Sequence, residues 1–214
     1  MDPCDDFPLL AAKDYAAAAV FEPTNLLREA RRQRDLADIA VPTVGLLDPD
    51  GDIVRYLAAS GRGRRHPGWA CYHTEMWTVD LDGIEIGVVG MAVGAPFAVL
   101  VAEQLAASGA ELILSINSAG QISAVVELPC FVLIEKALRD EGTSLHYQPP
   151  GRWSRLDDRL SARSGLGLVV GRCSEGQPLQ ATLQNQFLGR PERNAYLTPY
   201  MVSTMIESSH WHHM

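Results

Sequence analysis

The chain has 214 residues, 26 of them acidic and 18 basic, and a formal net charge of −8 at pH 7. A chain of this length suits a single α/β domain, and 47% hydrophobic residues is an ordinary proportion for a globular protein. An acidic surface repels nucleic-acid backbones and anionic membranes, so we expect neither as a partner. A local exception is the basic cluster, which we interpret as a solvated loop: Arg62, Arg64, Arg65 and His66.

The cysteines lie far apart and form no C-x-x-C pair: Cys4, Cys71, Cys130 and Cys173. This spacing argues against a zinc cage and against a disulfide framework. Thiols of this kind are typical of a reducing compartment, so we expect a cytoplasmic protein. The run from His210 to His213 is not expected to hold a metal, because neighbouring histidines at a chain end rarely face one ion. We therefore expect no metal and no organic cofactor.

Residues 1–40 are predicted to form a helical N-terminal extension, and residues 41–214 a single α/β domain. Apolar side chains recur at near-helical spacing from Leu26 to Ile39, and Thr24 or Asn25 is the expected cap. Beyond Pro150 no period is sustained, although Gly165–Arg172 has the composition of a strand. The structure of residues 151–214 is therefore left open.

The first expected strand is Val41–Leu47, followed by the turn Asp48-Pro49-Asp50-Gly51 and a helix over Ile53–Ala59. A hairpin is expected next, with strands Trp77–Leu81 and Ile84–Gly90 joined by Asp82-Gly83, a dipeptide suited to positive φ angles. The second strand of this hairpin is apolar at nearly every residue. Such strands are covered by helices on both faces.

The glycine-rich turn Gly90–Pro96 leads into an expected helix, Phe97–Ser108, which Gly109 ends, and into a buried strand, Ala110–Ile116. This order predicts a βαβ crossover, and sheets of that kind bind ligands beyond the carboxyl ends of their strands. A further strand is expected at Cys130–Ile134.

Three stretches therefore fall where a site would form: Gly90–Pro96, Asn117–Gly120 and Arg139–Pro150. Glycines in the first two let backbone N–H groups approach a ligand, and the helix from Phe97 adds a favourable field for an anion. Most α/β proteins use a glycine turn only to reverse the chain, so each stretch alone is weak evidence for a binding site. Their order along the chain favours a site.

The run Arg139–Pro149 resembles the Arg-x-Asp-Gly-Ala-Ser-x-His-Phe-x-Pro segment of uridine phosphorylases, and Gly142, Ser144, His146 and Pro149 match it outright. Upstream, Asp48-Pro49-Asp50 resembles the Gly-Asp-Pro-x-Arg turn of the same family, and Gly90–Gln104 resembles its glycine turn and helix. Asn117-Ser118-Ala119-Gly120 is similar to its Gly-Thr-x-Gly or Gly-Ser-Ala-Gly turn. The resemblance to the nucleoside phosphorylase superfamily covers roughly residues 41–150.

The resemblance implies a mixed central sheet, distorted into a barrel and flanked by helices, with a C-terminal part that does not match. It implies a homodimer or hexamer that cleaves the N-glycosidic bond of a purine or pyrimidine nucleoside, with inorganic phosphate as co-substrate or with water. His146 is the implied catalytic residue. Substrate contacts are implied for Gly94, Ser118, Ala119, Gly120, Arg139 and Ser144, and phosphate contacts for Asp48, Gly94 and Ser118.

Three arginines by which such enzymes grip phosphate are missing, since the matching places hold Gly51, Ser115 and Tyr72. Either Arg55 or the loop Arg62–Arg65 binds the anion instead, or water replaces phosphate. The Ser118-Ala119-Gly120 spelling resembles the hydrolytic branch, the nucleosidases.

The family's downstream Met-Glu motif is also missing, because the string Met205-Ile206-Glu207-Ser208 carries an inserted residue and arises easily by chance. These losses leave two further alternatives open. One is a catalytically impaired member that binds a nucleoside or scaffolds an oligomer. The other is that the segment after about Trp153 is not the natural continuation, through truncation or a shifted reading frame.

Overall fold

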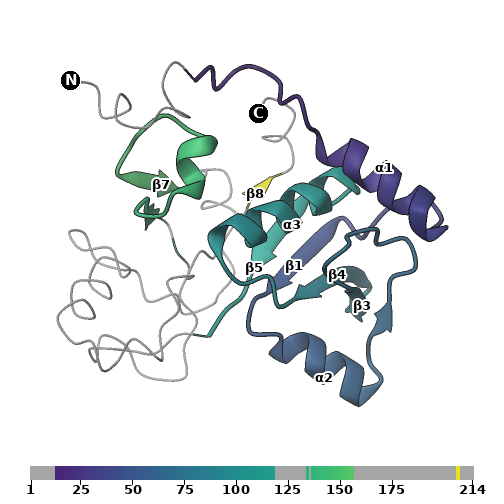
Figure 1. Cartoon of the computed structure of the whole chain (residues 1–214). Helices are drawn as coiled ribbons and strands as arrows, with labels where there is room; N and C mark the ends of the chain where they lie inside the picture. Colours follow the sequence, from purple (N-terminus) through teal and green to yellow (C-terminus); the bar gives the residue numbers. More distant parts are fainter. Residues whose placement is uncertain (1–12, 119–133, 135, 157–205, 208–214) are drawn as a thin grey trace, which may run out of the picture. The chain divides into compact units, whose positions relative to one another are not determined.

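A computed structural model describes residues 13–118, 134, 136–156 and 206–207 (Figure 1). The chain divides into two compact units, each described by itself. The sheet unit comprises Ala12–Asn117 with Met205–Met214, and the loop unit comprises Ser118–Thr204 with Met1–Ala11. The division into residues 1–40 and 41–214 stays a prediction.

The sheet unit is built on six strands in the order β2-β3-β4-β1-β5-β8. Their bounds are β1 Val44–Asp48, β2 Arg64–Arg65, β3 Met76–Leu81, β4 Ile84–Gly90, β5 Leu112–Ser115 and β8 Ile206–Glu207. The central strand β1 runs parallel to β4 and β5, whereas the pairs β2·β3, β3·β4 and β5·β8 are antiparallel. The sheet is therefore mixed, as predicted.

Three helices accompany this sheet: α1 Pro23–Arg34, α2 Asp52–Ser60 and α3 Ala95–Ala107. Helix α3 lies on one face of the sheet and α2 on the other, while α1 packs against the C-terminal end of α3 (Figure 1). The α/β class, with a sheet flanked by helices, is confirmed.

Successive side chains of the central strands pack on opposite faces of the sheet. Leu47 and Val89 join a buried cluster with Leu105 of α3, whereas Leu46 and Val88 join a second cluster with Leu57 of α2. Successive side chains of a strand point to opposite faces, so a strand covered on both sides must be apolar throughout. Each such side chain contributes about 1.5–3 kcal/mol on burial. This explains the apolar residues in the second half of β4, where residues 87–90 are buried, whereas Ile84 and Glu85 are exposed.

The hairpin between β3 and β4 forms where the sequence predicts it. Asp82 has φ 54° and Gly83 has φ 86°, which are the positive angles of a tight two-residue turn. The Gly83 N–H donates to the Asp80 carboxylate at 3.0 Å and closes the turn. The hairpin prediction is confirmed.

The predicted N-terminal extension is only partly helical in its described residues. Residues 13–22 contain no helix, and α1 begins at Pro23 with Glu22 as its N-cap. The prediction of Thr24 or Asn25 as cap was wrong. Proline has a helical φ and no N–H to satisfy, so it favours the first helical position, and the helix starts before either predicted cap.

Other boundaries shift by a few residues. Strand β1 begins at Val44 rather than Val41, because Pro42 has no N–H to contribute to a central strand. Helix α3 begins at Ala95 rather than Phe97, with a proline in its first turn. Most of the strand expected at Cys130–Ile134, and all of that at Gly165–Arg172, lies outside the described residues.

In the loop unit, β6 (Lys136–Leu138) and β7 (Trp153–Arg155) pair antiparallel. Between them lies a short 3-10 helix, η1, over Thr143–His146. The segment Arg139–Pro150 therefore follows a strand, as the sequence predicts. Across both units, none of the helices described has the length and apolar character needed to cross a bilayer.

Candidate functional site

The parallel strands β1, β4 and β5 end at one edge of the sheet. Asp48 pairs in register with Gly90, and Leu47 pairs with Ser115. The turn after β1, the glycine turn after β4 and the residues after β5 consequently start side by side. Ligands of such sheets bind at this carboxyl edge.

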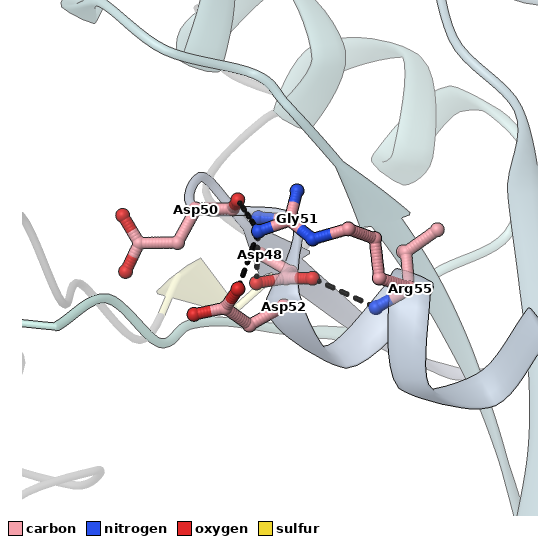
Figure 2. Close-up of polar contacts among 6 residues, drawn as sticks. Asp48, Asp50, Gly51, Asp52 and Arg55 are labelled. Atoms are coloured by element: carbon pink, nitrogen blue, oxygen red, sulfur yellow. Dashed lines mark hydrogen bonds and ion pairs between the residues drawn. The ribbon is translucent and has the colours of Figure 1, made fainter. Parts of the chain in front are cut away.

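Asp48 is buried and its carboxylate is part of the turn after β1. One oxygen accepts the Gly51 N–H at 3.1 Å and the other accepts the Val54 N–H at 2.9 Å (Figure 2). An anion at the start of α2 is also favoured by the helix dipole. Both carboxylate oxygens are thus engaged with the backbone of this turn and hold its shape. A direct phosphate contact by Asp48 stays a prediction.

Gly51 adopts φ +73°, a conformation that L side chains rarely take. A Cβ at this position would lie 2.8 Å from the Met91 sulfur and 3.0 Å from Nη1 of Arg55. The space above Gly51 is therefore already filled. A side chain at this position would have a strained backbone and would require the Met91 or Arg55 side chain to shift.

A guanidinium nevertheless lies over this turn. Nη2 of Arg55 donates to the Asp50 carbonyl at 2.9 Å and pairs with the Asp52 carboxylate (Figure 2). The Arg55 side chain is 57% exposed. Arg55, one helical turn after Gly51, thus brings a positive charge to the carboxyl edge of the sheet.

The glycine turn after β4 leads directly into α3. Gly94 has φ +98° and is the N-cap of α3, so the positive end of the helix dipole lies at this turn. Met91 has φ 67° and its side chain is 59% exposed. Exposed apolar residues at this turn were not singled out from sequence, because nothing in the chain order marks them as facing solvent.

The segment before β3 contacts the first helix of its own chain. The Tyr72 hydroxyl donates to Oε1 of Gln33 at 2.9 Å, and Arg34 donates to the Cys71 carbonyl at 2.9 Å. The ring of His73 meets Phe97 edge-on, with centroids 6.3 Å apart. Sequence reasoning missed this last pair, since 24 positions separate its members.

The basic cluster after α2 is engaged by carboxylates and an aromatic ring. Arg64 pairs with Glu85, and Arg65 pairs with Glu75 at 2.7 Å while its guanidinium lies 5.7 Å from the centre of the Trp77 ring. Both side chains are exposed, as expected, but the interpretation of a loop was wrong at these two residues, because Arg64–Arg65 form the edge strand β2.

His66, the last residue of this cluster, has both ring nitrogens engaged. Nδ1 accepts the Gly68 N–H at 3.2 Å and Nε2 lies 3.2 Å from the Ala40 carbonyl. This arrangement suits a neutral ring that donates from Nε2. Burial lowers the pKa of His66 below its ordinary value of 6.5.

In the loop unit, two predicted site residues meet. Nε of Arg139 donates to the Ser144 hydroxyl at 3.1 Å, and His146 is the exposed last residue of η1. Ser118 is exposed, whereas Ala119 and Gly120 lie outside the described residues. Gly94 belongs to the sheet unit, and Ser118 and His146 belong to the loop unit. Their convergence on a single hollow stays a prediction.

The string Met205–Ser208 is described in part. Ile206–Glu207 forms β8, in which Ile206 pairs with Ile113 and Glu207 with Leu112 of β5. A functional meaning for this string stays untested.

Comparison with known proteins places the chain in a family. The model of the phosphorylase superfamily matches residues 43–165, which is more than half of the chain. A uridine phosphorylase from Thermococcus kodakarensis is 31% identical over 108 residues, covering 45% of this chain and 39% of that protein. Among solved structures, the uridine phosphorylase from Vibrio fischeri ES114 complexed with 6-hydroxy-1-naphthoic acid is 20% identical, with a TM-score of 0.47, over 57% of this chain and 50% of that chain.

Proposed function

The chain belongs to the phosphorylase superfamily, and from that membership we propose that it cleaves the N-glycosidic bond of a purine or pyrimidine nucleoside. The attacking species is phosphate or water. The observation that carries this proposal is the placement of two family-like turns at one sheet edge, where Asp48 of β1 pairs with Gly90 of β4. The Thermococcus kodakarensis relative is a uridine phosphorylase, so uridine is the first substrate to test.

Cleavage of a glycosidic bond develops positive charge on the ribose and negative charge on the departing base. An enzyme accelerates this step by stabilising those charges where they develop. We assign the anionic nucleophile to the glycine turn at Gly94, where the N-terminus of α3 supplies a positive dipole end. From the family resemblance alone, we assign Ser118 to substrate binding. His146 is assigned to the sugar or the base.

We assign the role of phosphate-binding arginine to Arg55. Its guanidinium lies 3.0 Å from where a Cβ of Gly51 would be, so it fills space at the position whose own side chain is absent. Its known partners are one carbonyl and one exposed carboxylate, and an exposed ion pair of that kind is weak enough to exchange for phosphate. Arg64 and Arg65 face carboxylates as well, but they lie on the edge strand β2 rather than on a turn after a parallel strand.

A second candidate function is nucleoside binding or oligomer scaffolding without catalysis. It is favoured by the absence of a guanidinium at positions 51, 72 and 115 and by the contact of Tyr72 with Gln33 of its own chain. The chain also spans only 39% of the length of the Thermococcus kodakarensis relative. Only the first candidate function predicts turnover of a nucleoside.

The test is an assay of inosine, adenosine, uridine and methylthioadenosine, each with and without phosphate. Release of free base that requires phosphate supports a phosphorylase and rules out the hydrolytic form, whereas release without phosphate supports the nucleosidase. If no base is released, calorimetry with the same nucleosides separates a binder, which gives heat, from a scaffold, which gives none. No turnover and no binding would refute the proposal.

We further propose that the protein assembles as a homodimer or hexamer in the cytoplasm. The assembly is supported by the family resemblance, which implies that a neighbouring subunit completes each active site. The cytoplasmic location is supported by the wide spacing of the cysteines. Light scattering of the purified chain, at several concentrations, would reveal a monomer if the assembly proposal is wrong.

A further inference from the structure

In the loop unit, the side chain of Arg139 makes four hydrogen bonds. Its Nε donates to the Ser144 hydroxyl at 3.1 Å, and Nη2 donates to the Ser144 carbonyl at 2.9 Å. Nη2 also donates to the Gln148 carbonyl at 2.9 Å, and Nη1 donates to the Pro149 carbonyl at 2.7 Å. A guanidinium has five N–H donors. Four of these donors are thus directed at the loop in which Arg139 itself lies.

Glu141 holds the start of the same loop. Its carboxylate accepts the Thr143 N–H at 2.7 Å and the Ser144 N–H at 3.1 Å, which are the first N–H groups of η1. An anion at the start of a helical turn satisfies donors that have no partner within the turn. Glu141 therefore fixes where η1 begins.

The base of the loop is anchored as well. The Arg139 N–H donates to the Arg152 carbonyl at 2.9 Å, and Leu138 pairs with Trp153 in the β6·β7 ladder. A Cβ on Gly151 would lie 3.1 Å from Nη1 of Arg139, so the returning chain passes close against the guanidinium. The arginine is held between the two ends of the loop.

His146 is the residue that this arrangement presents. It lies between Ser144 and Gln148, whose carbonyls both accept from Arg139, and the N–H groups of Tyr147 and Gln148 each donate to the Ser144 carbonyl at 3.1 Å. The backbone on both sides of His146 is consequently fixed, while its side chain is exposed. This is the arrangement expected of a loop that presents one side chain in a set orientation.

We infer that Arg139 is a positioning residue, which acts on the reaction by fixing the loop that carries His146 and not by gripping the substrate. This inference rests on the proposed function for its catalytic consequence. Only one of its N–H donors is left for a ligand, whereas a bidentate grip on a substrate needs two. Lysine keeps the charge but has a compact ammonium, which does not match four acceptors spread around a planar group.

The first experiment measures steady-state kinetics with the nucleoside that the wild-type chain turns over. Arg139→Lys is expected to lower kcat roughly 10-fold and to leave KM within about twofold, because misplacing a catalytic group affects the transition state more than substrate binding. In a His146→Ala background the same substitution is expected to have no further effect. Arg152→Lys, in the adjacent β-hairpin segment, is the matched control and should match wild type.

The second experiment needs no activity. Amide hydrogen exchange at Tyr147 and Gln148 is expected to accelerate roughly 10-fold in Arg139→Lys and to stay unchanged in Arg152→Lys, because these amides donate within the loop that Arg139 holds. Unchanged exchange would overturn the inference. So would a raised KM at constant kcat, or a loss of kcat that persists in the His146→Ala background. If the wild-type chain turns over no nucleoside, the proposed function fails by itself, and amide exchange alone decides whether Arg139 fixes the loop.

Discussion

The backbone N–H of Met91 donates to the backbone carbonyl of Asp48 at 3.0 Å. This bond joins the first residue after β4 to the last residue of β1, next to the pair that Asp48 forms with Gly90. Met91 takes a left-handed conformation, φ 67°, which costs about 1–2 kcal/mol for a residue with a side chain. The bond to Asp48 helps to offset that cost. The two turns are therefore joined by a hydrogen bond, and we expect a substitution in one turn to affect the conformation of the other.

Substitution of Asp48 should destabilise this structure. In Asp48→Ala the N–H groups of Gly51 and Val54 lose a buried carboxylate partner. Hydrogen bonds to charged groups contribute about 1.5–3 kcal/mol each, and helix caps about 1 kcal/mol, so we expect the free energy of unfolding to fall by about 2–3 kcal/mol. Urea unfolding measures the change. Asp52→Ala, which removes an exposed carboxylate from the same turn, should cost less than about 1 kcal/mol, and equal losses in the two variants would contradict the assignment.

Gly51 should tolerate a side chain less well than Gly61. Both glycines have positive φ, +73° and +66°, but a Cβ at position 61 meets nothing within 4 Å, whereas at position 51 it meets the Met91 sulfur at 2.8 Å. Gly61→Ala is expected to cost about 1 kcal/mol from backbone strain alone and Gly51→Ala about 2 kcal/mol. In a Met91→Ala background the cost of Gly51→Ala should approach that of Gly61→Ala. A cost that does not depend on Met91 would show that the contact is unimportant.

Local sequence patterns predicted most elements of the sheet unit. The Asp82-Gly83 turn was predicted correctly from residue types within a few positions. The burial of β4 was predicted correctly for its second half, whereas Ile84 and Glu85 are exposed. The start of α1 was predicted wrongly, because threonine favours the N-cap position and proline favours the first helical position. Which of the two preferences sets the start depends on the backbone geometry. A sequence pattern does not record that geometry.

The candidate site was less predictable, since it depends on contacts between residues that no periodicity links. A strand followed by Asp-Pro-Asp-Gly indicates a turn, but not that the Asp48 carboxylate accepts the N–H of Val54, six residues later. Similarly, no sequence pattern indicates that Arg139 donates to the Pro149 carbonyl, ten residues on, and its predicted contact with substrate stays a prediction. The residue types were enough to identify the segment Arg139–Pro150, but its hydrogen bonds could be seen only in the structure.

Acid should destabilise the protein in part through His66. Burial lowers its pKa in the folded state below the ordinary value of 6.5, so the folded state favours the neutral ring. The stability contributed by this group is complete above pH 6.5 and is lost as the pH falls through the folded pKa. Urea unfolding at several pH values between 8 and 5 should show a smaller loss in His66→Gln than in wild type, because the carboxylates common to both proteins cancel in the comparison. Equal losses would contradict the prediction.

Phosphate binding should depend on Arg55 and not on the basic cluster. Arg55 and Arg64 are both exposed arginines paired with one carboxylate, so they form a matched pair that differs in position: Arg55 lies over the turn after β1, whereas Arg64 lies on the edge strand β2. Loss of a charge-assisted contact to phosphate costs about 1.5–3 kcal/mol, so KM for phosphate is expected to rise roughly 10- to 100-fold in Arg55→Ala.

Arg55→Lys should give an intermediate value, because lysine keeps the charge without the planar fork. Arg64→Ala should leave KM for phosphate within about twofold of wild type, since an exposed ion pair contributes little. A raised KM in Arg64→Ala alone would assign the anion to the basic cluster, and turnover that is independent of phosphate in every variant would assign the attack to water.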